Sequence, residues 1–492
     1  MYRLSLLERI ESIWHRFKCV PVALKSPYPP VNSPLYPKGP DSWLGVGWYN
    51  TPALDLSPSA QLLAFQPGHL LTLGGDQYRI HRKLRGQATS SVWLAEHTVR
   101  GHVASRRRFV ALETFNRLFS LATALEVRKE PRSPTTDLNY IRNITASQDR
   151  ALPGAECCDR VRAVFLPDRH LYAVKDPTGP TVWDLQLAQP KFSFSLAVTK
   201  RIIGDTLRAL KYIHSFGRTA VGVAPHNMLV THQCSSDSLS ANIVQFLQSH
   251  PPETIDPKPV DSEKSSTSTA PIPDTASPTP ETPAPSPGKI KTKRKTKHKP
   301  VAIAAPPPPK PSTTKPKNVA AVLKAQPLPA FGLSPNFDNI QVRLTRCEHA
   351  TLEKRLHERQ GDRPAKLAEY AHAELLIAAP EVLRGAPERW APPVNIWSLG
   401  NQVFQFLTGN YLFDVHKGPN GPRLPDWIEL VIISSPPTRF LEMRLRSHEH
   451  AVADLSEADV RQTCAFILRC LEMDPAKRAT AAELLEDEWF RT

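Results

Sequence analysis

The sequence lacks the patterns that mark several protein classes. Its seven cysteines include no pair at the spacing of a metal knuckle, and Cys157 and Cys158 are directly adjacent, so we predict neither a zinc knuckle nor a simple disulfide framework. Cysteines without such pairing are typical of reduced, intracellular proteins. No apolar run reaches the length of a membrane span, so we expect no membrane-spanning helix.

Acidic residues are outnumbered by basic ones. With 62 Lys and Arg against 47 Asp and Glu, the formal net charge is +15, which favours acidic partners. The stretch between His250 and Ala320 holds twelve Lys and Arg against six Asp and Glu, and so carries six of the fifteen surplus charges. The rest of the chain is only moderately basic, and the charge alone does not indicate nucleic-acid binding.

The same stretch has low sequence complexity. It holds 18 of the 50 prolines and many Ser and Thr, and this composition cannot bury enough apolar surface to offset the entropy cost of ordering. We therefore expect a disordered spacer here. Its basic run, Lys289–Lys299, fits a nuclear-import or nucleic-acid patch, and it fits a solvated block of charge in a linker equally well.

The N-terminal residues show a helical pattern. Between Met1 and Lys18, apolar residues recur at helical spacing among basic residues. This pattern predicts an amphipathic helix. A mitochondrial-type targeting helix is the alternative, and the acidic residues Glu8 and Glu11 count against it. Residues 19–64 are rich in proline and predict a loose extension.

From residue 65 onward, apolar patterning predicts regular elements. Tyr78–Leu84, Ser91–Ala95 and Phe109–Leu112 have the pattern of three successive antiparallel strands. Ser195–His214 carries apolar residues at helical spacing, which predicts a long amphipathic helix. With 40% of its residues hydrophobic, most of the chain is expected to fold around a sizeable core.

Several short motifs follow one another in a recognisable order. They are His214–Gly217 followed by Pro225 and Asn227, then Ala379–Glu381, Asn395–Gly400, Leu407–Gly409 and Met473–Thr480. Each motif alone is a weak signal, but all of them in this order are not expected by chance. Together they resemble the motifs of the eukaryotic serine/threonine protein kinases.

The resemblance extends to a subfamily. Phe65–Gly68, Leu73–Gly74 and Tyr78–Ile80 resemble the lead-in of the SR-protein kinases, the fungal ones especially, and Trp93 fits the same group. Members of that family typically carry a long spacer between the catalytic loop and the metal-binding motif. The low-complexity stretch of this chain lies at the same point.

The resemblance implies an α+β, two-lobed protein-kinase-like fold, with a small antiparallel β-rich lobe and a large helical lobe. The expected divisions are an N-terminal extension (1–64), the small lobe and hinge (65–186), the first part of the large lobe (187–249), the disordered spacer (250–336) and the rest of the large lobe (337–492).

The residues that carry phosphoryl transfer in this family are replaced. By resemblance, Glu113 replaces the lysine that pairs with phosphate, and Gly222 replaces the catalytic Asp. Ala224 replaces the lysine of the catalytic loop, and Arg346 replaces the Asp that binds Mg²⁺. A carboxylate at the first position repels phosphate, and a guanidinium at the last repels a metal ion. No catalytic residue is therefore predicted to be intact.

The glycine-rich loop is altered as well. Its two leading glycines are Arg85 and Gln87, whose side chains obstruct the close approach of backbone to phosphate, while Gly86 retains some flexibility. By resemblance, Gly86, Val92 and Ala111 are what remains of a degenerate nucleotide site.

Other family positions are kept. By resemblance Asn227 is the second metal ligand, although a loop-stabilising role fits it better once the first ligand is lost. Glu381 and Arg478 correspond to a buried salt bridge that holds the large lobe together in the family. Asn395 opens the motif that resembles D-I-W-S-L-G and is expected to be structural.

Three functions follow as hypotheses. We favour a catalytically impaired pseudokinase that binds a protein, such as a kinase or a splicing-type factor, with no ATP or Mg²⁺ expected. The alternative is an active serine/threonine kinase that uses ATP and Mg²⁺, with His226, His349, Glu348 or Asp205 supplying base or metal functions. In the third hypothesis, Lys289–Lys299 binds nucleic acid or an import receptor. The expected location is the cytoplasm, the nucleus or both.

Overall fold

The computed structural model describes residues 62–86, 90–100, 107–117, 120, 151–189, 191–220, 222–255, 322–345, 377–383, 391–413, 417–418, 421–422, 437–447 and 455–491. The predicted N-terminal helix, the basic run Lys289–Lys299 and positions Gln87, Arg346, Glu348 and His349 lie outside these ranges. The chain divides into two compact units, one formed by residues 1–254 with 323–492 and the other by residues 255–322. All residues described below, except Ile255 and Val322, belong to the first unit. Among the described residues, no helix is long and apolar enough to cross a membrane.

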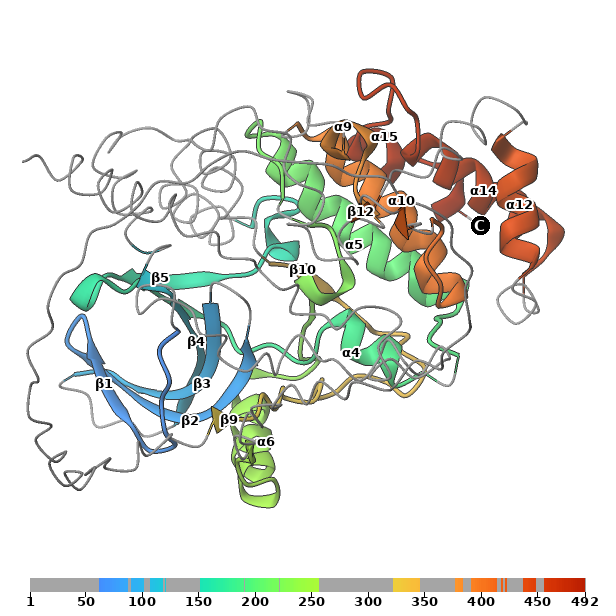
Figure 1. Cartoon of the computed structure of the whole chain (residues 1–492). Helices are drawn as coiled ribbons and strands as arrows, with labels where there is room; N and C mark the ends of the chain where they lie inside the picture. The colour runs from blue at the N-terminus through green and yellow to red at the C-terminus, as the bar shows by residue number, and fades with distance from the viewer. Residues whose placement is uncertain are drawn as a thin grey trace, which may run out of the picture. The chain divides into compact units, whose positions relative to one another are not determined.

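The first part of this unit is a six-stranded antiparallel sheet that curls on itself (Figure 1). Its strands lie in the order β1-β2-β3-β4-β6-β5. They are β1 (Leu70–Leu73), β2 (Asp76–Gly86), β3 (Ser90–Thr98), β4 (Arg108–Phe115), β5 (Val161–Phe165) and β6 (Tyr172–Lys175). The three strands predicted from the sequence are confirmed as parts of β2, β3 and β4.

The sheet is buried on both faces because its strands alternate between two apolar sets. One set includes Tyr78, Ile80, Trp93, Val110 and Leu112. The other set, which we call the α6 face, consists of Leu84, Val92, Leu94, Phe109 and Ala111.

The α6 face takes its name from the helix that packs against it, α6 (Ser236–Ser249), which lies beside the sheet in Figure 1. Ile243 of this helix is fully buried among the residues of that face. The guanidinium of Arg82 lies 4.7 Å from the ring centre of Phe246 and donates a hydrogen bond to the carbonyl of His250. The sequence analysis did not predict α6.

The segment that returns from the spacer packs on the same face. Leu328 is 1% exposed within the cluster of the α6 face, and the amide of Gln326 donates to the carbonyl of Lys83 at 2.9 Å. The sequence analysis placed residues 322–336 in the disordered spacer. This part of the predicted spacer is instead ordered and packed, because Leu328 and Phe331 supply the apolar surface that the spacer otherwise lacks.

The two ends of the spacer meet. The amide of Lys324 donates to the carbonyl of Glu253 at 2.9 Å, and the Lys324 Nζ lies 2.7 Å from the Glu253 Oε2. The chain therefore leaves the first unit and re-enters it at nearly the same point.

The second part of this unit is helical. Its α-helices are α4 (Val182–Leu187), α5 (Leu196–His214), α9 (Pro380–Leu383), α10 (Pro393–Thr408), α12 (Pro437–Arg446), α14 (Glu457–Cys470) and α15 (Ala481–Leu485). Its paired strands are β7 (Met228–Val230) with β10 (Val342–Leu344), and β11 (Lys417–Gly418) with β12 (Gly421–Pro422). Short strands β8 (Thr254–Ile255) and β9 (Val322–Leu323) flank the spacer, and single 3-10 turns are η3 (Ala155–Cys157), η4 (Pro167–Arg169), η5 (Pro225–Asn227) and η8 (Glu488–Phe490).

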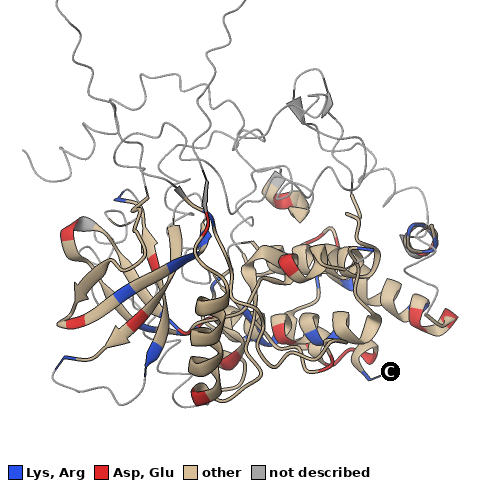
Figure 2. Ribbon diagram, turned by 90° about the horizontal axis from the view of Figure 1, so that it is seen from below, with Lys and Arg blue, Asp and Glu red and all other residues tan. Residues whose placement is uncertain are grey.

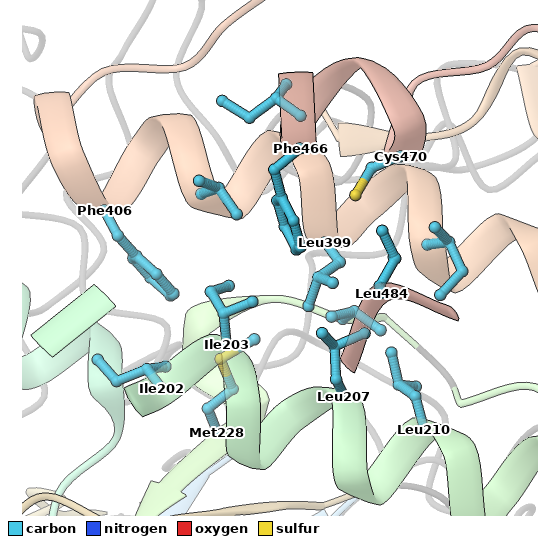
Figure 3. Packing of buried hydrophobic residues seen from close by; sticks show 14 of the residues in the cluster. Ile202, Ile203, Leu207, Leu210, Met228, Leu399, Phe406, Phe466, Cys470 and Leu484 are labelled. Carbon is cyan, nitrogen blue, oxygen red and sulfur yellow. The ribbon is translucent and has the colours of Figure 1, made fainter. Parts of the chain in front are cut away.

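Helix α5 confirms the predicted amphipathic helix, and its buried face packs against the other helices of the core. Ser195 caps it, since the Ser195 side chain accepts a hydrogen bond from the amide of Val198. Figure 3 shows its buried residues pointing toward α10, α14 and α15. The residues labelled there are Ile202, Ile203, Leu207 and Leu210 of α5, with Met228, Leu399, Phe406, Phe466, Cys470 and Leu484.

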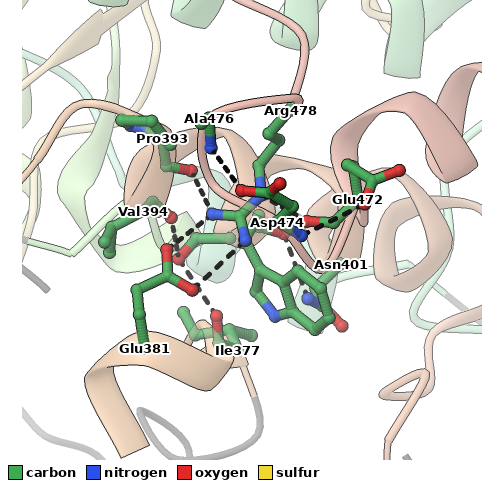
Figure 4. Close-up of polar contacts among 11 residues, drawn as sticks. Ile377, Glu381, Pro393, Val394, Asn401, Glu472, Asp474, Ala476 and Arg478 are labelled. Carbon is green, nitrogen blue, oxygen red and sulfur yellow. Dashed lines mark hydrogen bonds and ion pairs between the residues drawn. The ribbon is translucent and has the colours of Figure 1, made fainter. Parts of the chain in front are cut away.

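A buried ion pair joins α9 to the C-terminal part of the chain (Figure 4). Arg478 donates from Nη1 and Nη2 to the two carboxylate oxygens of Glu381, at 2.7 and 3.2 Å. It also donates to the carbonyls of Pro393 and Glu472, both at 2.8 Å, and its guanidinium lies over the ring of Trp397. Because every partner is buried or at a fixed backbone position, this one side chain ties α9, α10 and the segment after α14 together.

We expect Arg478→Met to destabilise the protein by about 3–5 kcal/mol, since it leaves the Glu381 carboxylate buried without its cation. The measurement is the free energy of unfolding from urea denaturation. The matched control is Arg446→Met, which removes an exposed ion pair with Glu457 and should change stability little. Equal losses for the two variants would contradict this account.

Candidate functional site

The candidate residues of the sheet lie next to one another on the α6 face. Val92 of β3 is 7% exposed, Ala111 of β4 is 1% exposed, and Glu113 follows Ala111 by two residues on the same strand. Glu113 therefore points to the same side as Ala111. Gly86 ends β2 opposite Ser91. Val92 and Ala111, the side chains expected to line a nucleotide site, are therefore both buried.

Glu113 belongs to a buried cluster centred on a lysine. The Nζ of Lys175 lies 2.7 Å from Glu113 Oε2 and 3.0 Å from Asp159 Oδ2. Ser90 Oγ donates to Glu113 Oε1 at 2.7 Å, and Thr345 Oγ1 donates to Asp159 Oδ2 at 3.2 Å. We call these five residues the Glu113 cluster. The side chains of its three ions are 3–6% exposed.

The strand register explains how Lys175 reaches Glu113. Ala111 of β4 pairs directly with Lys175 of β6, and Glu113 pairs with Ala173. Glu113 and Lys175 are therefore diagonal neighbours on one face of an antiparallel pair, which is within reach of a long side chain. The formal charge of Lys175, Glu113 and Asp159 together is negative, so this position has the opposite electrostatic character to a phosphate-binding lysine.

The sequence analysis missed Lys175 and Asp159. Neither belongs to any recognised motif. The available signal was a lysine at the end of the apolar strand Leu171–Val174, which is an unusual place for a charge unless it is paired. The sequence did not identify its partner, because that depends on the register between β4 and β6.

The side chain of Arg85, which the sequence analysis expected at the first glycine of the loop, turns into the protein. It is 7% exposed, and its Nη1 donates to the hydroxyl of Thr178 at 3.3 Å. Thr178 lies in the segment that leads from β6 to α4. The side chain of Arg85 thus crosses from β2 to this connecting segment.

The loop before β7 has a backbone that requires glycine. Gly222 has φ +68°, a conformation that L-residues adopt at a cost, and a Cβ placed there would lie 3.2 Å from Asn227 Nδ2. Asn227 is 1% exposed, and its Nδ2 donates to the carbonyl of Gly222 at 2.8 Å. The buried Ala224 accepts a hydrogen bond from the amide of Asn227. In this geometry Asn227 stabilises the loop.

Asn395 of α10 anchors the start of the same loop. Its Oδ1 accepts from the amide of Ala220 at 2.8 Å, and its Nδ2 donates to the carbonyl of Ala220 at 2.8 Å. The Nε2 of His214 lies 3.1 Å from the same Oδ1. Burial lowers the pKa of His214 below its ordinary value. An amide suits this position because it satisfies both backbone groups of one residue.

The residues considered as replacement bases are placed differently. Asp205 lies on α5, where its Oδ2 accepts from the amide of Val342 at 2.9 Å and its Oδ1 pairs with Arg208. Burial raises the pKa of Asp205. It therefore holds β10 in place and does not lie among the residues of the Glu113 cluster. Across the described ranges, no group of three or more His, Cys, Asp or Glu is arranged to hold a metal ion.

Comparison with known proteins gives a consistent family signal. Residues 366–490 match the family described as protein kinase domain. SRSF protein kinase 3 of Sus scrofa and that of Homo sapiens are each 31% identical over 137 residues, which cover 23% of this chain and 24% of the relative. Mitogen-activated protein kinase kinase kinase 15 of Mus musculus is 29% identical over 117 residues, 24% of this chain and 7% of that protein.

The matches therefore span about a quarter or less of the length of these relatives. A crystal structure of a kinase domain aligns with 87% of this chain and 98% of its own, at 12% identity and a TM-score of 0.44.

We expect Lys175→Met to lower the free energy of unfolding by about 3–5 kcal/mol, because two buried carboxylates lose their shared cation. The measurement is chemical denaturation. The control is Lys191→Met, which removes the same charge from an exposed position. The double variant Glu113→Gln with Lys175→Met should recover part of the loss, since one buried charge is removed with the other. Additive losses in the double variant would contradict a direct pair.

Proposed function

We propose that this chain, a eukaryotic serine/threonine kinase-like protein, transfers no phosphate and acts as a protein-binding scaffold or regulator. The observation that carries the proposal is the buried ion pair between Lys175 and Glu113. It occupies the strand position at which an active kinase presents a lysine to the nucleotide phosphates.

The electrostatics of the Glu113 cluster support this proposal. Phosphoryl transfer depends on positioning and on positive charge placed where phosphate charge develops. Here Glu113 contributes a carboxylate, and the ammonium of Lys175 is already shared between two carboxylates. A polyphosphate brought to this position would meet net negative charge at low dielectric.

The loop geometry supports it as well. Gly222, at the position expected for the catalytic Asp, has no side chain to orient a substrate hydroxyl, and its φ of +68° favours glycine. Arg85 stands where a glycine is expected, and its buried side chain donates a hydrogen bond to Thr178 in the segment after β6.

The alternative is an active serine/threonine kinase that uses ATP and Mg²⁺ by remodelled chemistry. One observation favours it, because Lys175 brings a cation to within 2.7 Å of the carboxylate that replaces the family's lysine. In that reading Lys175 would be a displaced phosphate-binding lysine. The two carboxylates that hold its ammonium count against it, since both would have to release it.

The partner class follows from the relatives, which are named as SRSF protein kinases and as kinases of protein kinases. We propose a protein partner, either a kinase or a splicing-type factor, met in the cytoplasm or the nucleus. The basic run Lys289–Lys299 remains a candidate for nucleic acid or an import receptor. Figure 2 shows acidic and basic residues interspersed along the described strands and helices.

We expect ATP to leave the melting temperature of the purified full chain unchanged, both without and with Mg²⁺. A ligand that bound the native state would raise that temperature. An active SR-protein kinase measured under the same conditions is the positive control. A Mg²⁺-dependent rise, together with transfer of phosphate to Arg/Ser-rich peptides, would overturn the proposal.

A further inference from the structure

The Glu113 cluster continues beyond the sheet into the helical part of the chain. Asp159 is its branching point, because one carboxylate oxygen contacts Lys175 at 3.0 Å and accepts from Thr345 at 3.2 Å. The amide of Asp159 also donates to the carbonyl of Leu344 at 2.9 Å. Asp159 therefore contacts the end of β10 through both its side chain and its backbone.

The contacts then run from β10 to the loop before β7. The amide of Thr345 donates to the carbonyl of Asn227 at 2.9 Å, and the amide of Asn227 donates to the carbonyl of Ala224 at 2.9 Å. The side chain of Asn227 closes the loop on Gly222 at 2.8 Å. A continuous series of hydrogen bonds and ion pairs thus links Glu113 to Gly222.

Burial makes this series stiff. Asp159, Asn227 and Thr345 are 6%, 1% and 8% exposed. In such an environment a hydrogen bond gains strength, and losing one member leaves its partner without solvent to replace it. The strands β7 and β10 are only three residues long, so these contacts are a large share of what fixes their ends.

We infer that Lys175 and Asp159 are positioning residues that form a nucleotide-independent clasp, holding the loop Gly222–Asn227 through Thr345. In an active kinase the metal–nucleotide complex bridges the corresponding elements. Here contacts within the protein join these elements directly, from Lys175 through Asp159 and Thr345 to Asn227. The inference concerns the order of the loop and holds whether or not phosphoryl transfer is lost.

The test is hydrogen exchange of the full chain carrying Thr345→Val, which keeps the side-chain shape and removes the hydroxyl that donates to Asp159. We expect amide exchange in residues 222–230 to rise about fivefold, the effect of losing one buried hydrogen bond on local opening. Exchange in α14, residues 457–470, should not change. Exchange in 222–230 that equals that of the unmodified protein would overturn the inference.

Two further variants make the result specific. Thr114→Val removes another buried threonine hydroxyl, which donates to the Ser91 carbonyl inside the sheet and lies off the clasp. It should raise exchange in β3 and β4 alone, and an equal rise in 222–230 would overturn the inference. Thr345→Ser retains the hydroxyl and should restore slow exchange in 222–230. Exchange as fast as in Thr345→Val would show that the methyl group and not the hydrogen bond holds the loop, and would also overturn it.

Discussion

A lysine ammonium held between two buried carboxylates is the constraint around which this structure is arranged. Removing three charges from water is expensive, and the arrangement persists only where geometry and further hydrogen bonds compensate. Ser90 and Thr345 supply those hydrogen bonds, one on each carboxylate. Glu113, Lys175, Asp159 and Thr345 come from separate segments of the chain. Replacing any one of them therefore weakens the contacts that join those segments.

This constraint also decides how the altered family positions should be understood. The carboxylate of Glu113 pairs with Lys175, and Gly222 adopts a left-handed backbone conformation that favours glycine. The side-chain amide of Asn395 bonds both backbone groups of Ala220. Each replacement fits its surroundings in hydrogen bonding and backbone conformation. Such agreement across neighbouring positions shows that the three replacements are compatible with their local surroundings.

Regular elements were predictable wherever a period repeats over several turns or residues. The strands of the sheet and helix α5 follow from alternation and from helical spacing, and the cap at Ser195 agrees with both. Helix α6 carries the same kind of signal, with Leu239, Ile243, Phe246 and Leu247 at helical spacing after the Ser235 cap, and the sequence analysis overlooked it. Lys175 and Asp159 were missed because the pairing of single charges depends on strand register, which the local sequence does not specify.

The meeting of Glu253 and Lys324 has a consequence for how this chain can vary. Once both ends of a segment are held at one point, the entropic cost of closing it grows only with the logarithm of its length, about 0.6 kcal/mol for each doubling. For the first unit, the cost of closing the chain between these two residues therefore changes little with the length of the segment. The length of the sequence between Glu253 and Lys324 can therefore change while the first unit keeps its fold.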